Sequence, residues 1–275
     1  MRHKYQINLI SDSTGETLDR IFLAIKSQFS NFDCEKKEFV FIRTENQIDK
    51  IIKETMKKTN SIILYTVVET RLAKYISNEC NKQKIPCFSI LGNLILNFSK
   101  LLNQKATHTP SAQHVLDDEY YKRIEAIQFT MLHDDGMKTE DVASADIILL
   151  GVSRTSKTPT SIYLANRGYK TLNIPLVGKQ NIPDILKKNP ENFCIVGLVV
   201  EAEQLSLIRS NRLEIMKDKT IQKYSNLNFI QEEIENSKKL FKKYKWPAID
   251  VTRKSVEETA ATAIRIFDIK KKQKK

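Results

Sequence analysis

An eight-residue segment between a buried strand and a helix constrains this chain more than any other feature. The apolar run 147–150 has the length and branching of a buried strand, and a helical pattern opens near Ser161. This order of elements is the context in which G-x-x-x-x-G-K-[ST] holds phosphate, with backbone N–H groups pointing inward at a helix N-terminus. The sequence therefore predicts a phosphate-binding loop, GVSRTSKT, made of Gly151, Val152, Ser153, Arg154, Thr155, Ser156, Lys157 and Thr158.

Three positions of this loop carry specific expectations. Lys157 is expected to reach the terminal phosphates, and the Thr158 hydroxyl is expected to ligate Mg²⁺. Ser156 departs from the pattern, which has Gly there because the backbone can need a positive φ. The alternative interpretation is a turn rich in Ser and Thr that caps a buried helix.

Two pairs of charged residues outside the loop are further candidates for the functional site. Asp134 and Asp135, next to His133, form the densest titratable cluster, which could hold Mg²⁺ or act as a general base. A polar turn at a helix C-terminus explains the same residues. Arg209 and Arg212 lie three apart on one helix face, so they either clamp a phosphate or form an ordinary solvated face.

The N-terminal hundred residues alternate between strand and helix patterns. This alternation predicts a Rossmann-like parallel sheet with helices on both faces. The predicted strands are 5–10, 39–42, 61–68 and 85–91, with helices around 18–25, 48–56, 70–84 and 94–102. The polar loop 11–17, SDSTGET, follows the first strand, where ligands bind in such sheets. A capping box of Ser13 and Glu16 explains that loop equally well.

The length of 275 residues favours two domains. We predict an N-terminal α/β domain over 1–104, a linker and helix over 105–144, and a P-loop kinase-like α/β domain over 145–275. The C-terminal part is expected to contain strands at 171–177 and 194–200, helices at 205–213 and 227–245, and a closing strand and helix. Ser255 and Glu258 are spaced as a capping box for that last helix.

Composition excludes several classes of protein. No apolar run reaches the ~18 residues of a membrane span, and the N-terminus does not read as a signal peptide. The four cysteines form no C-x-x-C pair, so we expect reduced thiols in a cytoplasmic protein. Five lysines of the +12 net charge lie in the last six residues, which we expect to be a solvated tail. Without a basic stripe interleaved with aromatics, no nucleic-acid partner is predicted.

Four separated segments resemble one known family in the right order. They read SDSTGET, YYKRIEAIQFTMLHDDG, ADIILLGVSRTSKTPTSIYLANRGYK and WPAIDVTRKSVEETA. Together they resemble the pyruvate, phosphate dikinase regulatory protein family over nearly the whole chain. The resemblance implies a bifunctional serine/threonine protein kinase and phosphorylase. Such proteins phosphorylate a dikinase threonine with ADP, releasing AMP, and remove the phosphate with inorganic phosphate, giving pyrophosphate.

The resemblance also indicates which residues bind the nucleotide, and other interpretations of the function stay open beside it. The family's nucleotide-binding loop maps onto residues 151–158, and its members have Ser or Gly at position 156. The roles of Asp134 and Asp135 are inferred from their chemistry and not from the resemblance. Because both reactions are similar in-line displacements, we expect Lys157, Mg²⁺ on Thr158 and one of these aspartates to serve both. A sister group acts on phosphoenolpyruvate synthase, and a homodimer is plausible, although no residue indicates it. The other interpretations are a small-metabolite P-loop kinase and a nucleotide-sensing module whose basic surface binds RNA.

Overall fold

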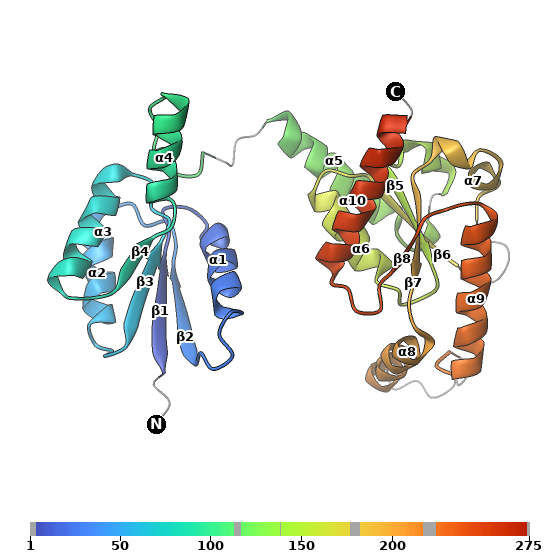
Figure 1. The fold of residues 1–275 in the computed structure, drawn as a ribbon, viewed down its shortest axis with the longest axis horizontal. Coiled ribbons are helices and arrows are strands. Elements are labelled where there is room, and N and C mark those ends of the chain that lie inside the picture. Colours follow the sequence, from blue (N-terminus) through green and yellow to red (C-terminus); the bar gives the residue numbers. More distant parts are fainter. Residues whose placement is uncertain (1–3, 113–116, 138, 177–181, 217–223, 274–275) are drawn as a thin grey trace. The chain divides into compact units, whose positions relative to one another are not determined.

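The chain forms two compact α/β units (Figure 1). The computed structural model describes residues 4–112, 117–137, 139–176, 182–216 and 224–273. The first unit is Met1–Val115 and the second is Leu116–Lys275. This division places helix α5 (Asp118–Leu132) in the second unit. Each unit contains a four-stranded, fully parallel sheet, so the predicted fold class is confirmed.

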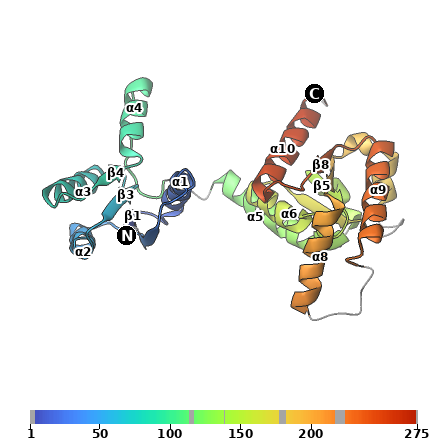
Figure 2. The same ribbon diagram turned by 60° about the horizontal axis from the view of Figure 1, so that its bottom comes forward.

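The first unit has the strand order β2-β1-β3-β4. Its strands are β1 (Tyr5–Ile10), β2 (Cys34–Phe39), β3 (Ser61–Tyr65) and β4 (Cys87–Ser89). Its helices are α1 (Glu16–Lys26), α2 (Glu45–Thr55), α3 (Thr70–Lys82) and α4 (Gly92–Leu102). Alternate residues of β1 enter different cores, because successive side chains of a strand point to opposite faces. Ile7 and Leu9 pack with α1, whereas Ile10 packs with α2 and α3, and both views place α1 on the other side of the sheet (Figures 1 and 2).

Two strand predictions in this unit were wrong in their bounds. The second strand is Cys34–Phe39 rather than 39–42. Four consecutive charged residues, 35–38, hid it, and the strand tolerates them because it pairs along one edge only. The fourth strand is Cys87–Ser89, much shorter than the predicted 85–91. The third is Ser61–Tyr65, within the predicted 61–68.

The second unit has the strand order β6-β5-β7-β8. Its strands are β5 (Ile147–Gly151), β6 (Thr171–Pro175), β7 (Ile195–Val199) and β8 (Ala248–Asp250). After α5 its α-helices are α6 (Lys157–Asn166), α7 (Asp184–Lys188), α8 (Ala202–Met216), α9 (Leu227–Lys243) and α10 (Val256–Gln273). Short 3₁₀ helices are η1 (Asp134–Gly136), η2 (Thr139–Ser144) and η3 (Pro190–Asn192).

Strand β5 lies at the centre of the second unit. Its burial on both faces explains its continuous apolar sequence. Ile147 and Leu149 enter the core that includes α6 and α10, and Ile148 and Leu150 enter the core on the opposite face. A strand buried on both faces has no need of polar alternation. Because β6 and β7 flank β5 on opposite sides, the strand order reverses at its carboxyl end, where open α/β sheets bind ligands. Loop 151–158 begins at that point.

Three predictions about helix ends have different outcomes. The capping box of Ser255 and Glu258 is confirmed, since each residue's side chain accepts from the other's backbone N–H. The box of Ser13 and Glu16 does not form, because Gly15 is the N-cap of α1 and makes no side-chain cap. The tail prediction was also wrong in part, because α10 continues through the lysines to Gln273. No helix in the described residues is long and apolar enough to cross a membrane.

Candidate functional site

Loop 151–158 connects the buried strand β5 to helix α6, as the sequence predicts. Gly151 closes the strand at a point where no side chain fits. A Cβ there would lie 2.6 Å from Thr155 Oγ1 and 2.9 Å from the Leu198 carbonyl oxygen. The first position of the loop therefore requires glycine for close approach of neighbouring atoms, with an ordinary negative φ.

Two non-glycine residues of the loop have left-handed backbones. Arg154 has φ 74° and Ser156 has φ 59°. Such conformations are uncommon outside glycine, because Cβ approaches the following carbonyl. Ser156 occupies the position at which the motif has glycine, so the structure supplies the reason for that preference: the backbone turns left-handed immediately before α6. The strain is local to the loop, which is where functional sites commonly hold it.

Lys157 is folded into the loop rather than extended into solvent. Its side chain is buried, and Nζ donates a 2.9 Å hydrogen bond to the Val152 carbonyl oxygen. Thr155 Oγ1 donates to the same oxygen at 2.9 Å. Burial lowers the pKa of Lys157 to about 8, although the charges of Asp135 and Asp134 act in the opposite direction. A desolvated ammonium group at a helix N-terminus is suited to an anion.

Three polar side chains converge beside the start of α6. Thr158 Oγ1 donates to Asp134 Oδ1 at 3.1 Å. Asn173 Nδ2, on strand β6, donates to Asp134 Oδ1 at 2.5 Å and to Thr158 Oγ1 at 3.0 Å. Asn173 is fully buried, and its Oδ1 has no hydrogen-bond partner among the described residues. One lone pair of the Thr158 hydroxyl stays uncommitted after these bonds, because a hydroxyl oxygen has two.

The two aspartates of η1 differ in their surroundings. Asp134 is partly buried in the network just described, whereas Asp135 is exposed and has a left-handed backbone with φ 51°. The hydrogen bond from Thr158 to Asp134 places η1 beside the loop, and both carboxylates act to raise the pKa of Lys157. His133 is buried and directed elsewhere, with Nδ1 2.6 Å from the Phe129 carbonyl oxygen and Nε2 3.2 Å from Asp141 Oδ2.

The predicted pair of arginines separates in the structure. Arg212 is exposed, but Arg209 is buried and its Nη2 donates to the Ser153 carbonyl oxygen at 3.1 Å. Arg209 also forms a 2.8 Å ion pair with Glu233 Oε2. The two arginines therefore form neither a joint clamp nor a solvated face. Arg209 instead stabilises loop 151–158 through its hydrogen bond to the Ser153 carbonyl oxygen.

Tyr224 joins the same side of the loop. Its Oη lies 3.2 Å from Ser153 Oγ and accepts from Arg154 Nε at 3.4 Å. Burial acts to raise the pKa of Tyr224, but its hydrogen bonds with Ser153 and Arg154 and the nearby arginine charges outweigh that effect and lower the pKa. The Arg209 guanidinium lies over the Tyr224 ring, 4.6 Å from its centroid.

Asn173 and Tyr224 were missed from the sequence. Asn173 left a usable signal, because it is an amide in the otherwise apolar strand TLNIP, and buried polar residues need a partner. Tyr224 left no such signal, because its contacts with Ser153 and Arg154 join residues 71 and 70 positions apart in the chain.

The residues fit Mg²⁺ bound together with a phosphate. A hydroxyl and a carboxylate with their oxygens in hydrogen-bond contact are hard ligands, and Mg²⁺ is commonly held by one carboxylate plus substrate phosphates and waters. No group of three His, Cys, Asp or Glu side chains that could hold a metal occurs in the described part of the chain. Thr158 and Asp134 are therefore the residues that would hold the ion.

Fold and geometry together define an α/β protein whose second unit presents a buried lysine, a hydroxyl and a carboxylate at the end of its central strand. The family model described as kinase/pyrophosphorylase matches residues 7–264. The chain belongs to this family and is a phosphotransferase.

Three relatives that match over nearly the full length carry the same name. A pyruvate, phosphate dikinase regulatory protein of Pelagibacter ubique strain HTCC1062 is 65% identical over 98% of this chain and 99% of its own length. Proteins of the same name from Bartonella bacilliformis and Chelativorans sp. are 40% and 41% identical, over 96% and 95% of this chain and 93% and 96% of their own. The predicted resemblance is thus confirmed.

Proposed function

We propose that this protein switches pyruvate, phosphate dikinase off and on by moving one phosphoryl group. In the kinase direction, the β-phosphoryl of ADP passes to a threonine of the dikinase, leaving AMP. In the phosphorylase direction, inorganic phosphate takes that group from phosphothreonine, forming pyrophosphate and restoring the hydroxyl. The family description and the relatives' names support the pairing of these two activities.

The observation that carries the proposal is the meeting of Lys157, Thr158 and Asp134 at the start of α6. Phosphoryl transfer needs positioning and charge neutralisation more than covalent chemistry. The Lys157 ammonium would exchange its bond to the Val152 carbonyl for an oxygen of the phosphoryl group that moves. Backbone N–H groups of loop 151–158 would hold the neighbouring phosphate.

The two aspartates would then have different tasks. Asp134 is committed to Thr158 and Asn173, which suits a residue that holds Mg²⁺. Bound Mg²⁺ would neutralise charge on the phosphates in both directions. Asp135 is exposed, and no described residue donates a hydrogen bond to it, which suits a base that accepts the proton of the attacking threonine. In the reverse direction the same carboxylate returns a proton to the leaving threonine oxygen.

One site can serve both directions because both are in-line displacements at the same phosphorus position. In each, an oxygen nucleophile attacks a phosphoryl group held opposite Lys157. The leaving group is AMP in one case and threonine in the other. A cytoplasmic location, in which Cys34, Cys80 and Cys87 stay reduced, is part of the proposal.

The test of this function uses purified protein, phosphohistidine-charged dikinase, Mg²⁺ and ADP labelled with ³²P at the β-phosphate. We expect label on a dikinase threonine, which establishes donor and target together. Transfer to phosphoenolpyruvate synthase instead would assign the protein to the sister group. Transfer to neither protein would contradict the proposal and favour a small-metabolite kinase.

A further inference from the structure

Arg209, on helix α8, is a buried cation beside loop 151–158 that has no part in the phosphoryl transfer proposed above. The residue is 2% exposed. Its Nη2 donates to the Ser153 carbonyl oxygen at 3.1 Å, and its Nη1 donates to the Tyr224 carbonyl oxygen at 3.0 Å. Glu233, on α9, forms a 2.8 Å ion pair with Nη2. Because a buried charge is costly unless it is paired, these contacts fix the guanidinium in one place.

The hydrogen bond to Ser153 sets the direction of one N–H group of the loop. In a planar trans peptide, the carbonyl of one residue and the N–H of the next point in opposite directions. The Ser153 carbonyl is directed at Arg209, so the Arg154 N–H is directed away from it. No described residue accepts a hydrogen bond from this N–H group. Loops of this kind hold phosphate with such free backbone N–H groups.

The backbone of Arg154 needs outside support because it is left-handed, with φ 74°. A non-glycine residue keeps such a conformation only where its surroundings determine it. Tyr224 supplies contacts on both sides of the strained bond, since its Oη lies 3.2 Å from Ser153 Oγ and accepts from Arg154 Nε at 3.4 Å. The ring of Tyr224 in turn lies 4.6 Å from the Arg209 guanidinium. Arg209 and Tyr224 therefore hold this part of the loop together.

An arginine suits this position better than a lysine. Its planar guanidinium carries two terminal nitrogens, and here each donates to a different carbonyl. A lysine has a single nitrogen at the end of its stem. A buried ion pair is often no more stable than well-packed apolar groups, so the burial of this charge indicates a role in the site rather than in folding.

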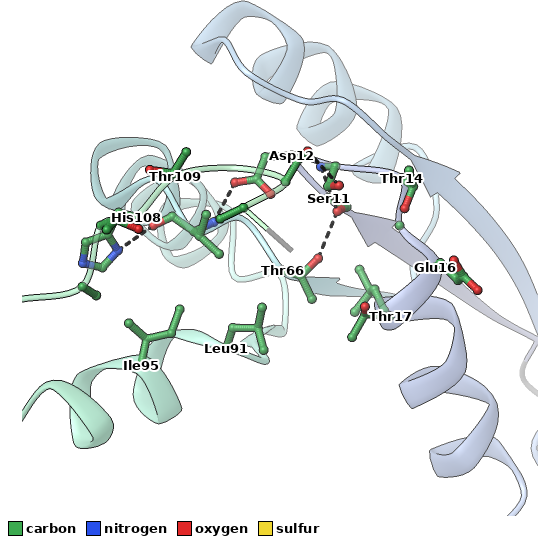
Figure 3. A pocket seen from close by; sticks show the side chains of 18 residues that line it. Ser11, Asp12, Thr14, Glu16, Thr17, Thr66, Leu91, Ile95, His108 and Thr109 are labelled. Atoms are coloured by element: carbon green, nitrogen blue, oxygen red, sulfur yellow. Dashed lines mark hydrogen bonds between the residues drawn. The ribbon is translucent and has the colours of Figure 1, made fainter. Parts of the chain in front are cut away.

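The first unit also has a polar loop after a central strand, but that loop contains a buried acid. Loop 11–17 follows β1 and borders a pocket of about 480 Å³ (Figure 3). There the buried carboxylate of Asp12 accepts from Val68 N at 2.8 Å. A carboxylate accepts from backbone N–H groups, whereas a guanidinium only donates. The arginine of the second unit therefore holds its loop through a carbonyl and leaves the N–H groups to an anion.

We propose that Arg209 is a positioning residue for phosphate binding, which holds the Ser153 carbonyl so that the Arg154 N–H meets an oxygen of the bound phosphate. Tyr224 keeps Arg154 in the left-handed conformation that this direction requires. Arg209 acts through the loop and does not touch the ligand. The inference rests on the proposed function, because it takes loop 151–158 as the binding site of ADP.

The test is calorimetric titration of ADP with Mg²⁺ into the full chain and its variants. Arg209→Lys keeps the charge but has one nitrogen in place of two, so the dissociation constant of ADP should rise by about tenfold or more. Arg212→Lys is the matched control, because Arg212 is exposed on the same helix, and it should leave the constant within about twofold. A merely structural role would lower the fraction of protein that binds, without changing the affinity of that fraction.

Two further measurements follow the loop itself. Bound ADP should slow hydrogen exchange of the Arg154 amide in the unchanged protein, and Arg209→Lys should remove this protection. Tyr224→Phe keeps the ring beside Arg209 and removes only the hydroxyl, so the variant should fold and bind ADP about threefold more weakly or worse.

The outcomes separate this inference from the proposed function. Unchanged ADP affinity in Arg209→Lys, or unchanged protection of the Arg154 amide, would overturn the inference and leave the proposed function standing. Should Arg209→Lys fail to fold, Tyr224→Phe decides, and unchanged affinity in that variant would overturn the inference as well. Failure of the unchanged protein to bind ADP would overturn both.

Discussion

The hydroxyl of Thr158 donates a 3.1 Å hydrogen bond to the carboxylate of Asp134, although the two residues are 24 positions apart in the chain. The contact joins the first turn of α6 to the 3₁₀ helix η1. Asn173, on the neighbouring strand β6, donates to both groups. Three elements therefore fix one hydroxyl and one carboxylate side by side, which is the arrangement that Mg²⁺ and a phosphate need.

Replacing Asp134 tests this arrangement. Asp134→Asn keeps the size of the side chain but removes the charge, so Mg²⁺ should no longer strengthen ADP binding. Calorimetry with and without Mg²⁺ measures the difference directly. Asp184→Asn is the matched control, because Asp184 is an exposed carboxylate of the same unit paired only with Lys187 in the contacts described. A Mg²⁺ effect equal to that of the unchanged protein would show that Asp134 does not hold the ion.

Asn173 is expected to act through its neighbours rather than on substrate. Asn173→Ala removes both donors, so Asp134 and Thr158 lose their orientation, and kcat should fall by about 10- to 100-fold. The Mg²⁺ concentration for half-maximal activity should rise in parallel. A merely structural role would lower thermal stability without changing the Mg²⁺ requirement, and that result would count against a positioning role.

Ser156 should be easier to replace by glycine than by any branched residue. Ser156→Gly removes the left-handed strain but adds freedom to the unfolded chain, so the free energy of unfolding should be unchanged or rise by up to about 1 kcal/mol. Ser156→Val should lower it by about 1–2 kcal/mol, since a β-branched side chain resists positive φ. Urea unfolding of the two variants checks the order. Equal stabilities would mean that the loop relaxes at little cost.

Burial of Lys157 predicts a stability that depends on pH. Lys157→Met removes a desolvated charge, and the Val152 carbonyl keeps its bond from Thr155, so the variant should be more stable at pH 7 by about 1–3 kcal/mol. The folded pKa of about 8 lies below the ordinary 10.5. Between these values the folded state releases its proton first, so the unchanged protein gains stability as pH rises.

The advantage of Lys157→Met should therefore be full below pH 8 and disappear towards pH 10.5. Thermal unfolding of both proteins in phosphate-free buffer across this range measures it. A gap that stays constant with pH would contradict a depressed pKa. Loss of phosphate binding in the more stable variant would identify the charge as one kept for function at the expense of stability.

The sequence predicted the second unit well because its signals are local. The apolar run of β5 is buried on both faces, and the loop motif follows it directly. The edge strand β2 was misplaced because it has one sheet neighbour and a run of four charged residues, so it contains no apolar run to detect. Asp134 was selected for its chemistry, but its contact with Thr158 depends on how α5 and η1 pack against β6, which no local pattern encodes.

The loops of the first unit show the same limit. Loop 11–17 was a candidate from its place after a strand, and a capping box explained it equally well. The structure removes that explanation, because Gly15 caps α1 without a side chain. The contacts of Ser111 with Ser13 and of His108 with Val68 could not be predicted, because they join residues 98 and 40 positions apart in the chain.

The measurement that tests the central claim most directly assays both reactions with one preparation of Lys157→Ala. Transfer of label from ADP to the dikinase threonine and release of pyrophosphate from the phosphorylated dikinase are followed side by side. A single site for both directions predicts that both rates fall together, by about 100-fold or more. Loss of one rate with the other intact would contradict the shared site.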